Sequence, residues 1–211
     1  MCYKNTHFRF VLKIINASFH HMKSCRVLAS VFQTLALFCV PLLTALNVLY
    51  LPYINTKKMR KITRIFVHCT ATYQATTTEK TLRDEFRRKG WKNPGYHYVV
   101  KPDGNIIFMH PEEKVANGVK GYNQNSIHVA WIGGIDKEHP NGIDNRTGAQ
   151  KLALFDLLVK MKLKYKDAII MGHRDISPDL NHNGVVDPWE RIKACPCFDA
   201  MVEYADINKL G

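Results

Sequence analysis

Short runs of β-branched and aromatic residues recur beyond residue 59, and Gly, Pro, Asn or Asp residues separate them. Runs of this length and composition predict β-strands. Pro102, Asp103 and Gly104 stand between two of these runs and predict a tight turn, so the two runs should form a hairpin. The predicted strands cover residues 62–68, 96–101, 105–109, 126–132 and 168–171.

Two longer segments have the spacing of helices. Thr76 and Glu79 have the spacing of a capping box and predict a helix that ends before Gly90. Thr147 and Gln150 likewise predict the start of a long helix, which ends near residue 165. The apolar residues expected on the buried face of this second helix are Leu152, Phe155, Leu158 and Val159.

The order of these elements predicts the fold class. Strands and helices interleave, and one tight hairpin lies among them, which favours an α/β fold. We therefore expect residues 59–211 to form a single domain with a mixed central β-sheet flanked by helices. An apolar N-terminal segment precedes this domain.

That N-terminal segment has two interpretations. Residues 27–54 are apolar over a length that can cross a bilayer as a helix. Basic residues lie on both sides of the stretch, so its charge indicates no orientation. Residues 1–58 are either a membrane anchor, with a transmembrane helix at about 27–54, or an extension upstream of a true start at Met59. They carry no catalytic signal in either case.

The distribution of net charge bears on whether the protein binds nucleic acid. The chain has 211 residues and a formal net charge of +12. Seven Lys and Arg residues but no Asp or Glu lie in residues 1–58, which leaves +5 for the rest. This modest charge, without a Lys/Arg-rich helix or zinc-finger spacing, argues against nucleic acid as a partner. Six cysteines in a chain of this length do not resemble a disulfide scaffold.

Three residues that can bind a metal stand at predicted strand or loop ends, namely His68, His173 and Cys195. Two imidazoles and one thiolate suit Zn²⁺, which in catalytic sites commonly takes three protein ligands and water. Each residue alone is weak support, because a single His or Cys is more often a packed core residue. Their wide separation in the sequence does not show that they meet.

Four motifs occur in order along the domain and together carry a resemblance. They are Val67–Thr72 (VHCTAT), Gly95–Tyr98 (GYHY), Gly172–Asp175 (GHRD) and Lys193–Pro196 (KACP). In order and interval they resemble the zinc-dependent N-acetylmuramoyl-L-alanine amidases of type 2, which include phage lysozyme-type amidases and peptidoglycan recognition proteins. The resemblance covers about residues 59–205.

The resemblance implies roles for five residues. It places zinc ligands at His68, His173 and Cys195, a catalytic lysine at Lys193, and at Tyr96 a tyrosine that orients or deprotonates water. The implied reaction is zinc-dependent hydrolysis of the amide between N-acetylmuramic acid and L-alanine. Cys197 is an alternative to Cys195, which is favoured because it precedes Pro196. Three other residues have no matched role: Cys69 is interpreted as core, His97 as structural, and His128 lies within a strand.

The implied partner is peptidoglycan or its muropeptide fragments, and we expect a monomer. The alternative function is a non-catalytic peptidoglycan-binding module, as in relatives that lack the thiolate ligand.

The substrate lies outside the bacterial cytoplasmic membrane. If residues 1–58 are genuine, the enzyme is membrane-anchored or periplasmic to extracellular. If they are not, it is a lysin made in the cytoplasm without a leader.

A second metal-like motif lies at residues 179–190, which fit the calcium loop of an EF-hand. Two interpretations stay open. The loop either binds Ca²⁺ weakly or is a turn, rich in Asx residues, that carries residues 193–195 toward the zinc site. The oxygen ligands expected for Ca²⁺ are Asp179, Asn181, Asn183, Val185 (backbone), Asp187 and Glu190.

Overall fold

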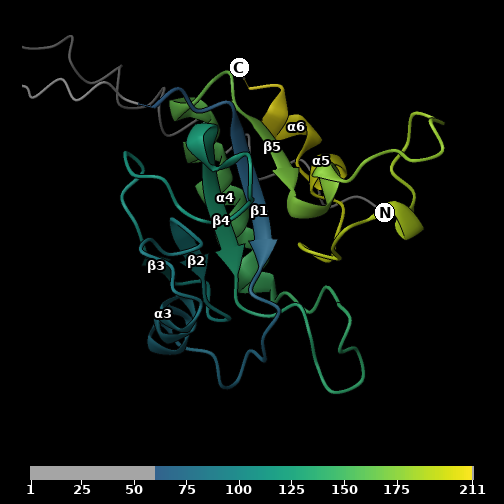
Figure 1. Ribbon diagram of the computed structural model, residues 1–211. Coiled ribbons are helices and arrows are strands. Elements are labelled where there is room, and N and C mark those ends of the chain that lie inside the picture. The colour runs from purple at the N-terminus through teal and green to yellow at the C-terminus, as the bar shows by residue number, and fades with distance from the viewer. Residues whose placement is uncertain (1–59, 211) are drawn as a thin grey trace, which may run out of the picture. The chain divides into compact units, whose positions relative to one another are not determined.

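The computed structural model describes residues 60–210. A five-stranded sheet runs through this part of the chain in the order β3-β2-β4-β1-β5 (Figure 1). Its strands are β1 (Arg64–Cys69), β2 (Tyr98–Val100), β3 (Ile106–Phe108), β4 (Ser126–Trp131) and β5 (Ile169–Gly172). Strand β3 pairs antiparallel to β2, and the other neighbours pair parallel, so the sheet is mixed as predicted.

Helices cover both faces of the sheet. The longer ones are α3 (Glu79–Arg88) and α4 (Gly148–Lys164), followed by the single-turn helices α5 (Ala200–Glu203) and α6 (Ala205–Asn208). Short 3-10 helices occupy Asn123–Asn125, His173–Ile176 and Pro188–Glu190. The predicted α/β domain with a mixed, helix-flanked sheet is confirmed.

The alternation of side chains along β1 separates a large core from the face that bears the site. Ile65, Val67 and Cys69 pack into the main core with α4, α5 and α6. Each large apolar side chain that is fully buried contributes roughly 1.5–3 kcal/mol to folding. Because side chains alternate along a strand, Phe66 and His68 point to the opposite face. Cys69 is therefore a core residue, as predicted from the sequence.

Two predictions about the helices need correction. The capping box of α3 joins Thr78 to Thr81, not Thr76 to Glu79, because the Thr76 N–H instead closes a turn on the Tyr73 carbonyl. The box of Thr147 and Gln150 at the start of α4 is confirmed.

The second prediction that was wrong concerns which side chains of α4 are buried. Leu152 and Phe155 are 63% and 48% exposed, so they do not belong to this face, whereas Leu158 is fully buried. The side chains that face the sheet instead follow the helical spacing of Leu154, Leu157, Leu158 and Met161.

Within residues 60–210, no helix is long and apolar enough to span a membrane. The stretch 27–54 and the boundary at Met59 lie outside the described residues, so the membrane anchor and the extension upstream of a true start at Met59 both stay predictions.

Candidate metal centre

Two of the three predicted ligands lie at one edge of the sheet. His68 is the penultimate residue of β1, and His173 directly follows β5. These strands are parallel and pair Val67 with Gly172. The two imidazoles therefore emerge side by side at the carboxyl end of the parallel strands, where α/β sheets typically place their sites.

A loop before α5 brings the third ligand to this edge. The N–H of Arg174 donates to the Cys195 carbonyl at 2.8 Å, which joins the two ligand-bearing segments. Gly172 makes the close approach possible, because a Cβ at this position would lie 2.6 Å from Cδ of Pro196. A side chain at position 172 would push the Cys195 segment away from the two histidines.

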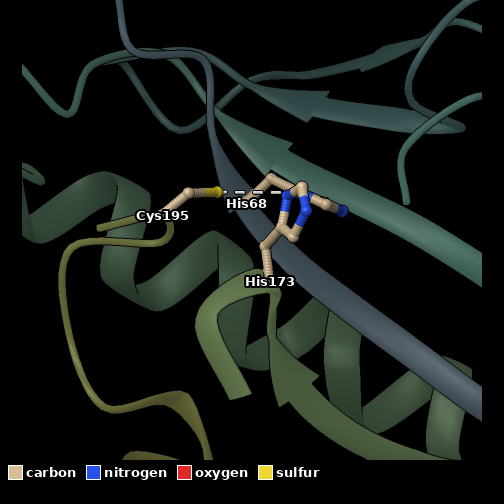
Figure 2. Close-up of side chains that lie close together, drawn as sticks. All are labelled: His68, His173 and Cys195. Carbon is tan, nitrogen blue, oxygen red and sulfur yellow. Dashed lines mark hydrogen bonds between the residues drawn. The ribbon is translucent and has the colours of Figure 1, made fainter. Parts of the chain in front are cut away.

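The three donor atoms converge, as Figure 2 shows. One ligand atom from each of His68, His173 and Cys195 lies within 4.8 Å of the others. Nδ1 of His68 is 3.6 Å from Sγ of Cys195, and the Cys69 N–H donates to the same sulfur at 3.3 Å. In the part of the chain that the structure describes, no other group of three His, Cys, Asp or Glu side chains converges in this way.

Burial and charge keep both imidazoles neutral at neutral pH. Burial lowers the pKa of His68 well below its ordinary value, and the charges of His128, His173 and Lys193 lower it further. Burial, with the charge of Lys193, lowers the pKa of His173 to about 4. Neutral imidazoles have a free lone pair, and with one thiolate they form a donor set that fits zinc.

The other two thiols face each other. Sγ of Cys69 and Sγ of Cys197 are 3.6 Å apart. The pKa of Cys69 is raised to about 12, chiefly by hydrogen bonding with Cys195, and that of Cys197 is raised first by hydrogen bonding with Cys69. Both stay protonated thiols at neutral pH and face each other, whereas the Cys195 sulfur faces His68.

The two other predicted site residues lie beside this cluster. The ring centroid of Tyr96 is 5.3 Å from that of His68. Burial raises the pKa of Tyr96 well above its ordinary value, so its hydroxyl is protonated at neutral pH. Lys193 is exposed, and its charge acts on both His68 and His173.

A cavity of about 350 Å³ is lined by chain neighbours of His173 and Cys195, although none of the three ligands lines it. Three cationic side chains, Arg174, Arg191 and Lys193, contribute to its wall, so it favours anionic groups. The remaining lining residues are Gly142, Pro188, Ala194 and Cys197.

His128 has no role predicted from the sequence, yet its side chain contacts the predicted metal ligand His68. Its Nδ1 lies 3.1 Å from Nε2 of His68, and both rings are buried. The sequence indicated only that His128 lies in a strand. The alternation of residues along a strand predicts the sheet face on which a side chain lies, but not the side chain that it contacts. The structural role expected for His97 is confirmed, because its Nδ1 accepts the backbone N–H of His128 at 2.9 Å.

The loop at residues 179–190 is closed by its own hydrogen bonds. Asp179 accepts the N–H groups of Asn183 and Gly184 at 3.2 and 2.7 Å. Glu190 accepts those of Leu180, Asn181 and Asp187 at 2.7, 3.1 and 2.7 Å. The side-chain amides of Asn181 and Asn183 donate to Asp187, and Val185 is 61% exposed. These contacts fit the interpretation as a turn and lend no support to calcium.

Comparisons with known proteins agree with this geometry. Residues 58–196 match the family described as N-acetylmuramoyl-L-alanine amidase. The endolysin of Klebsiella phage KP32 is 36% identical over 144 residues, which cover 67% of this chain and 85% of the endolysin. The endolysin of Escherichia phage T7 is 34% identical over 147 residues, or 69% of this chain and 87% of that protein.

A solved structure supports the fold. The N-acetylmuramoyl-L-alanine amidase LysC from Clostridium intestinale URNW matches with a TM-score of 0.55 at 22% identity, over 70% of this chain and 86% of that one. The family match spans more than half of the chain and includes the sheet, both histidines and Cys195. The chain therefore belongs to the N-acetylmuramoyl-L-alanine amidase family.

Proposed function

We propose that this chain is a zinc-dependent hydrolase that cleaves the amide between N-acetylmuramic acid and L-alanine in peptidoglycan or its muropeptide fragments. The observation that carries the proposal is the convergence of His68, His173 and Cys195 within 4.8 Å, in a chain of this amidase family. No nucleophilic Ser or Cys is required, because Cys195 serves as a ligand.

The three donors would hold the metal from three separate segments. His68 and His173 present neutral imidazoles, and the Cys69 N–H stabilises negative charge on the Cys195 sulfur. When bound, a zinc ion lowers the pKa of water toward about 7 and polarises the scissile carbonyl.

Tyr96 and Lys193 complete the chemistry. The Tyr96 phenol is protonated at neutral pH, so it can act as a hydrogen-bonding group that orients water or substrate. Lys193 extends from an exposed position near both histidines and supplies positive charge where the amide oxygen becomes negative. A comparable oxyanion interaction is worth roughly 3–4 kcal/mol in the transition state. The cationic cavity beside Lys193 suits the carboxylates of a peptide substrate.

The proposal is tested with purified full-length protein and purified peptidoglycan. Mass spectrometry should detect free peptides that begin with L-alanine. A zinc chelator should abolish their release, and added Zn²⁺ should restore it. Binding to peptidoglycan without cleavage by zinc-loaded protein would contradict the proposal and support a recognition module. Cleavage that persists with a chelator and no bound metal would overturn the zinc mechanism.

Calcium binding by the 179–190 loop stays a separate hypothesis. It rests on the spacing of the oxygen-bearing residues. Ca²⁺ added to the chelated protein should raise its melting temperature if the hypothesis holds, and an unchanged melting temperature would contradict it.

A further inference from the structure

A buried imidazole supports His68 from the side opposite Cys195. Strands β1 and β4 pair parallel, with Phe66 opposite His128 and His68 opposite Ala130. The ring of His128 therefore lies on the same sheet face as that of His68. Nδ1 of His128 is 3.1 Å from Nε2 of His68, and the two residues are 0% and 1% exposed.

The two nitrogens of His68 consequently have different surroundings. Nδ1 lies 3.6 Å from the Cys195 sulfur, on the side of the three converging donors. A neutral imidazole carries one lone pair and one N–H. If the Nδ1 lone pair serves as the ligand, Nε2 of His68 carries the proton and its N–H donates a hydrogen bond to Nδ1 of His128. His128 must then carry its own proton on Nε2.

Packing alone is a poor explanation for His128. Its ring stacks on Phe66 with an interplanar angle of 6° and on His97 with 12°. Its Nε2 is buried and has no hydrogen-bond partner among the described residues. A buried unpaired polar group costs about 1–3 kcal/mol. An apolar side chain would fill the same space without this cost.

Gly118, ten residues before His128 in the sequence, leaves room for the imidazole ring of His128. A Cβ on residue 118 would lie 2.3 Å from Nδ1 of His128, and Gly118 has none. Gly118 therefore provides space for the edge of the His128 ring that contacts His68. The unpaired Nε2 and the space at Gly118 together direct attention to the Nδ1 edge of His128.

We propose that His128 is a positioning residue that fixes the tautomer and orientation of His68 through its Nδ1 acceptor, and thereby strengthens metal binding. The inference rests on the proposed function, in which His68 binds zinc. Removal of a hydrogen-bond partner of a metal-binding histidine typically weakens metal affinity 10- to 100-fold.

A matched pair of substitutions in the full-length protein tests this role. Asn places a carbonyl oxygen close to the position of Nδ1, whereas Leu has nearly the same shape and no acceptor. Competition with a chromogenic chelator gives the zinc dissociation constant. His128→Leu should weaken binding 10- to 100-fold, and His128→Asn should stay within a few-fold of the unsubstituted protein. Equal affinity in all three proteins, or equal weakening in both variants, would overturn the role.

A measurement on the unsubstituted protein covers the case in which His128→Leu does not fold. Long-range ¹H–¹⁵N NMR of the zinc-loaded chain distinguishes the two tautomers of each histidine. His128 should carry its proton on Nε2 and leave Nδ1 unprotonated. A proton on Nδ1 would exclude the acceptor role.

His173→Ala separates failure of this role from failure of the metal site. If the unsubstituted protein binds no zinc, or His173→Ala binds it as tightly, the proposed metal site is wrong and the role of His128 falls with it. If His173→Ala loses zinc but His128→Leu retains full affinity, only the role of His128 is overturned.

Discussion

Cys195 and Cys197 are two thiols separated by one proline, and their side chains have different partners. The Cys195 sulfur lies beside His68, whereas the Cys197 sulfur lies beside Cys69. We expect Cys195→Ala to lose bound zinc and amide cleavage, and the matched variant Cys197→Ala to retain both. Zinc content after dialysis and peptide release provide the two measurements. The reverse result would transfer the ligand role to Cys197.

Lys193 is expected to act on turnover without contributing to the fold. It is exposed, and its charge acts on the two histidines. Lys193→Ala should retain zinc and the melting temperature but lower kcat about 10²- to 10³-fold, because one donor to the developing oxyanion is removed. Lys160→Ala, at an exposed position on α4, is the control and should leave kcat unchanged. Full activity in Lys193→Ala would refute the assignment.

Site residues could be predicted from the sequence where they belong to a motif, but not where their role depends only on a contact in the folded protein. His68, His173 and Cys195 could be selected because their neighbours form ordered motifs, and the structure brings them together. His128 could not be selected, since its significance comes from register with β1 and from the space at Gly118. Neither can be read from the residues around position 128.

At the scale of elements, local signals predicted the strands and the longer helices well. Each predicted strand corresponds to an observed one, and the hairpin turn is present because the Gly104 N–H bonds the Lys101 carbonyl at 2.9 Å. The buried face of α4 was wrong because Leu152 and Phe155 are apolar but exposed. Apolar residues occur around much of this helix, so its orientation depends on the sheet it packs against.

The C-terminal helices depend on a buried cation that the sequence did not indicate. The Arg146 side chain is 0% exposed and pairs with Asp144 at 2.7 Å and Glu203 at 2.8 Å. Its guanidinium also lies 3.3 Å from the ring centroid of Phe198. These contacts join the segment before α4 to α5.

Loss of this cation should destabilise the fold. Arg146→Ala leaves two carboxylates without their partner, and because these are partly exposed the expected loss of unfolding free energy is about 2–3 kcal/mol. Urea denaturation gives the value. Lys80→Ala on α3 removes an exposed ion pair and should cost less than about 0.5 kcal/mol. Equal losses in the two variants would show that the buried network adds no stability.

For the whole molecule, the arrangement of strands explains why residues distant in sequence form one centre. Parallel strands place their carboxyl ends at the same edge, so the ends of β1 and β5 bring together His68 and His173. The loop that carries Cys195 reaches this edge because Gly172 leaves room for Pro196. All of these parts lie within residues 60–210, where α3 to α6 flank the sheet.

The location of these parts in the sequence predicts the result of a truncation. A protein that starts at Met59 retains every described strand, helix and site residue, so it should fold, bind zinc and cleave peptidoglycan fragments with unchanged kcat/KM. Full-length protein assayed in parallel on soluble muropeptides is the control. If residues 1–58 are an anchor, only the full-length chain should bind lipid vesicles. If the shortened protein is unfolded or loses zinc, the boundary at Met59 is wrong and residues 1–58 belong to the catalytic domain.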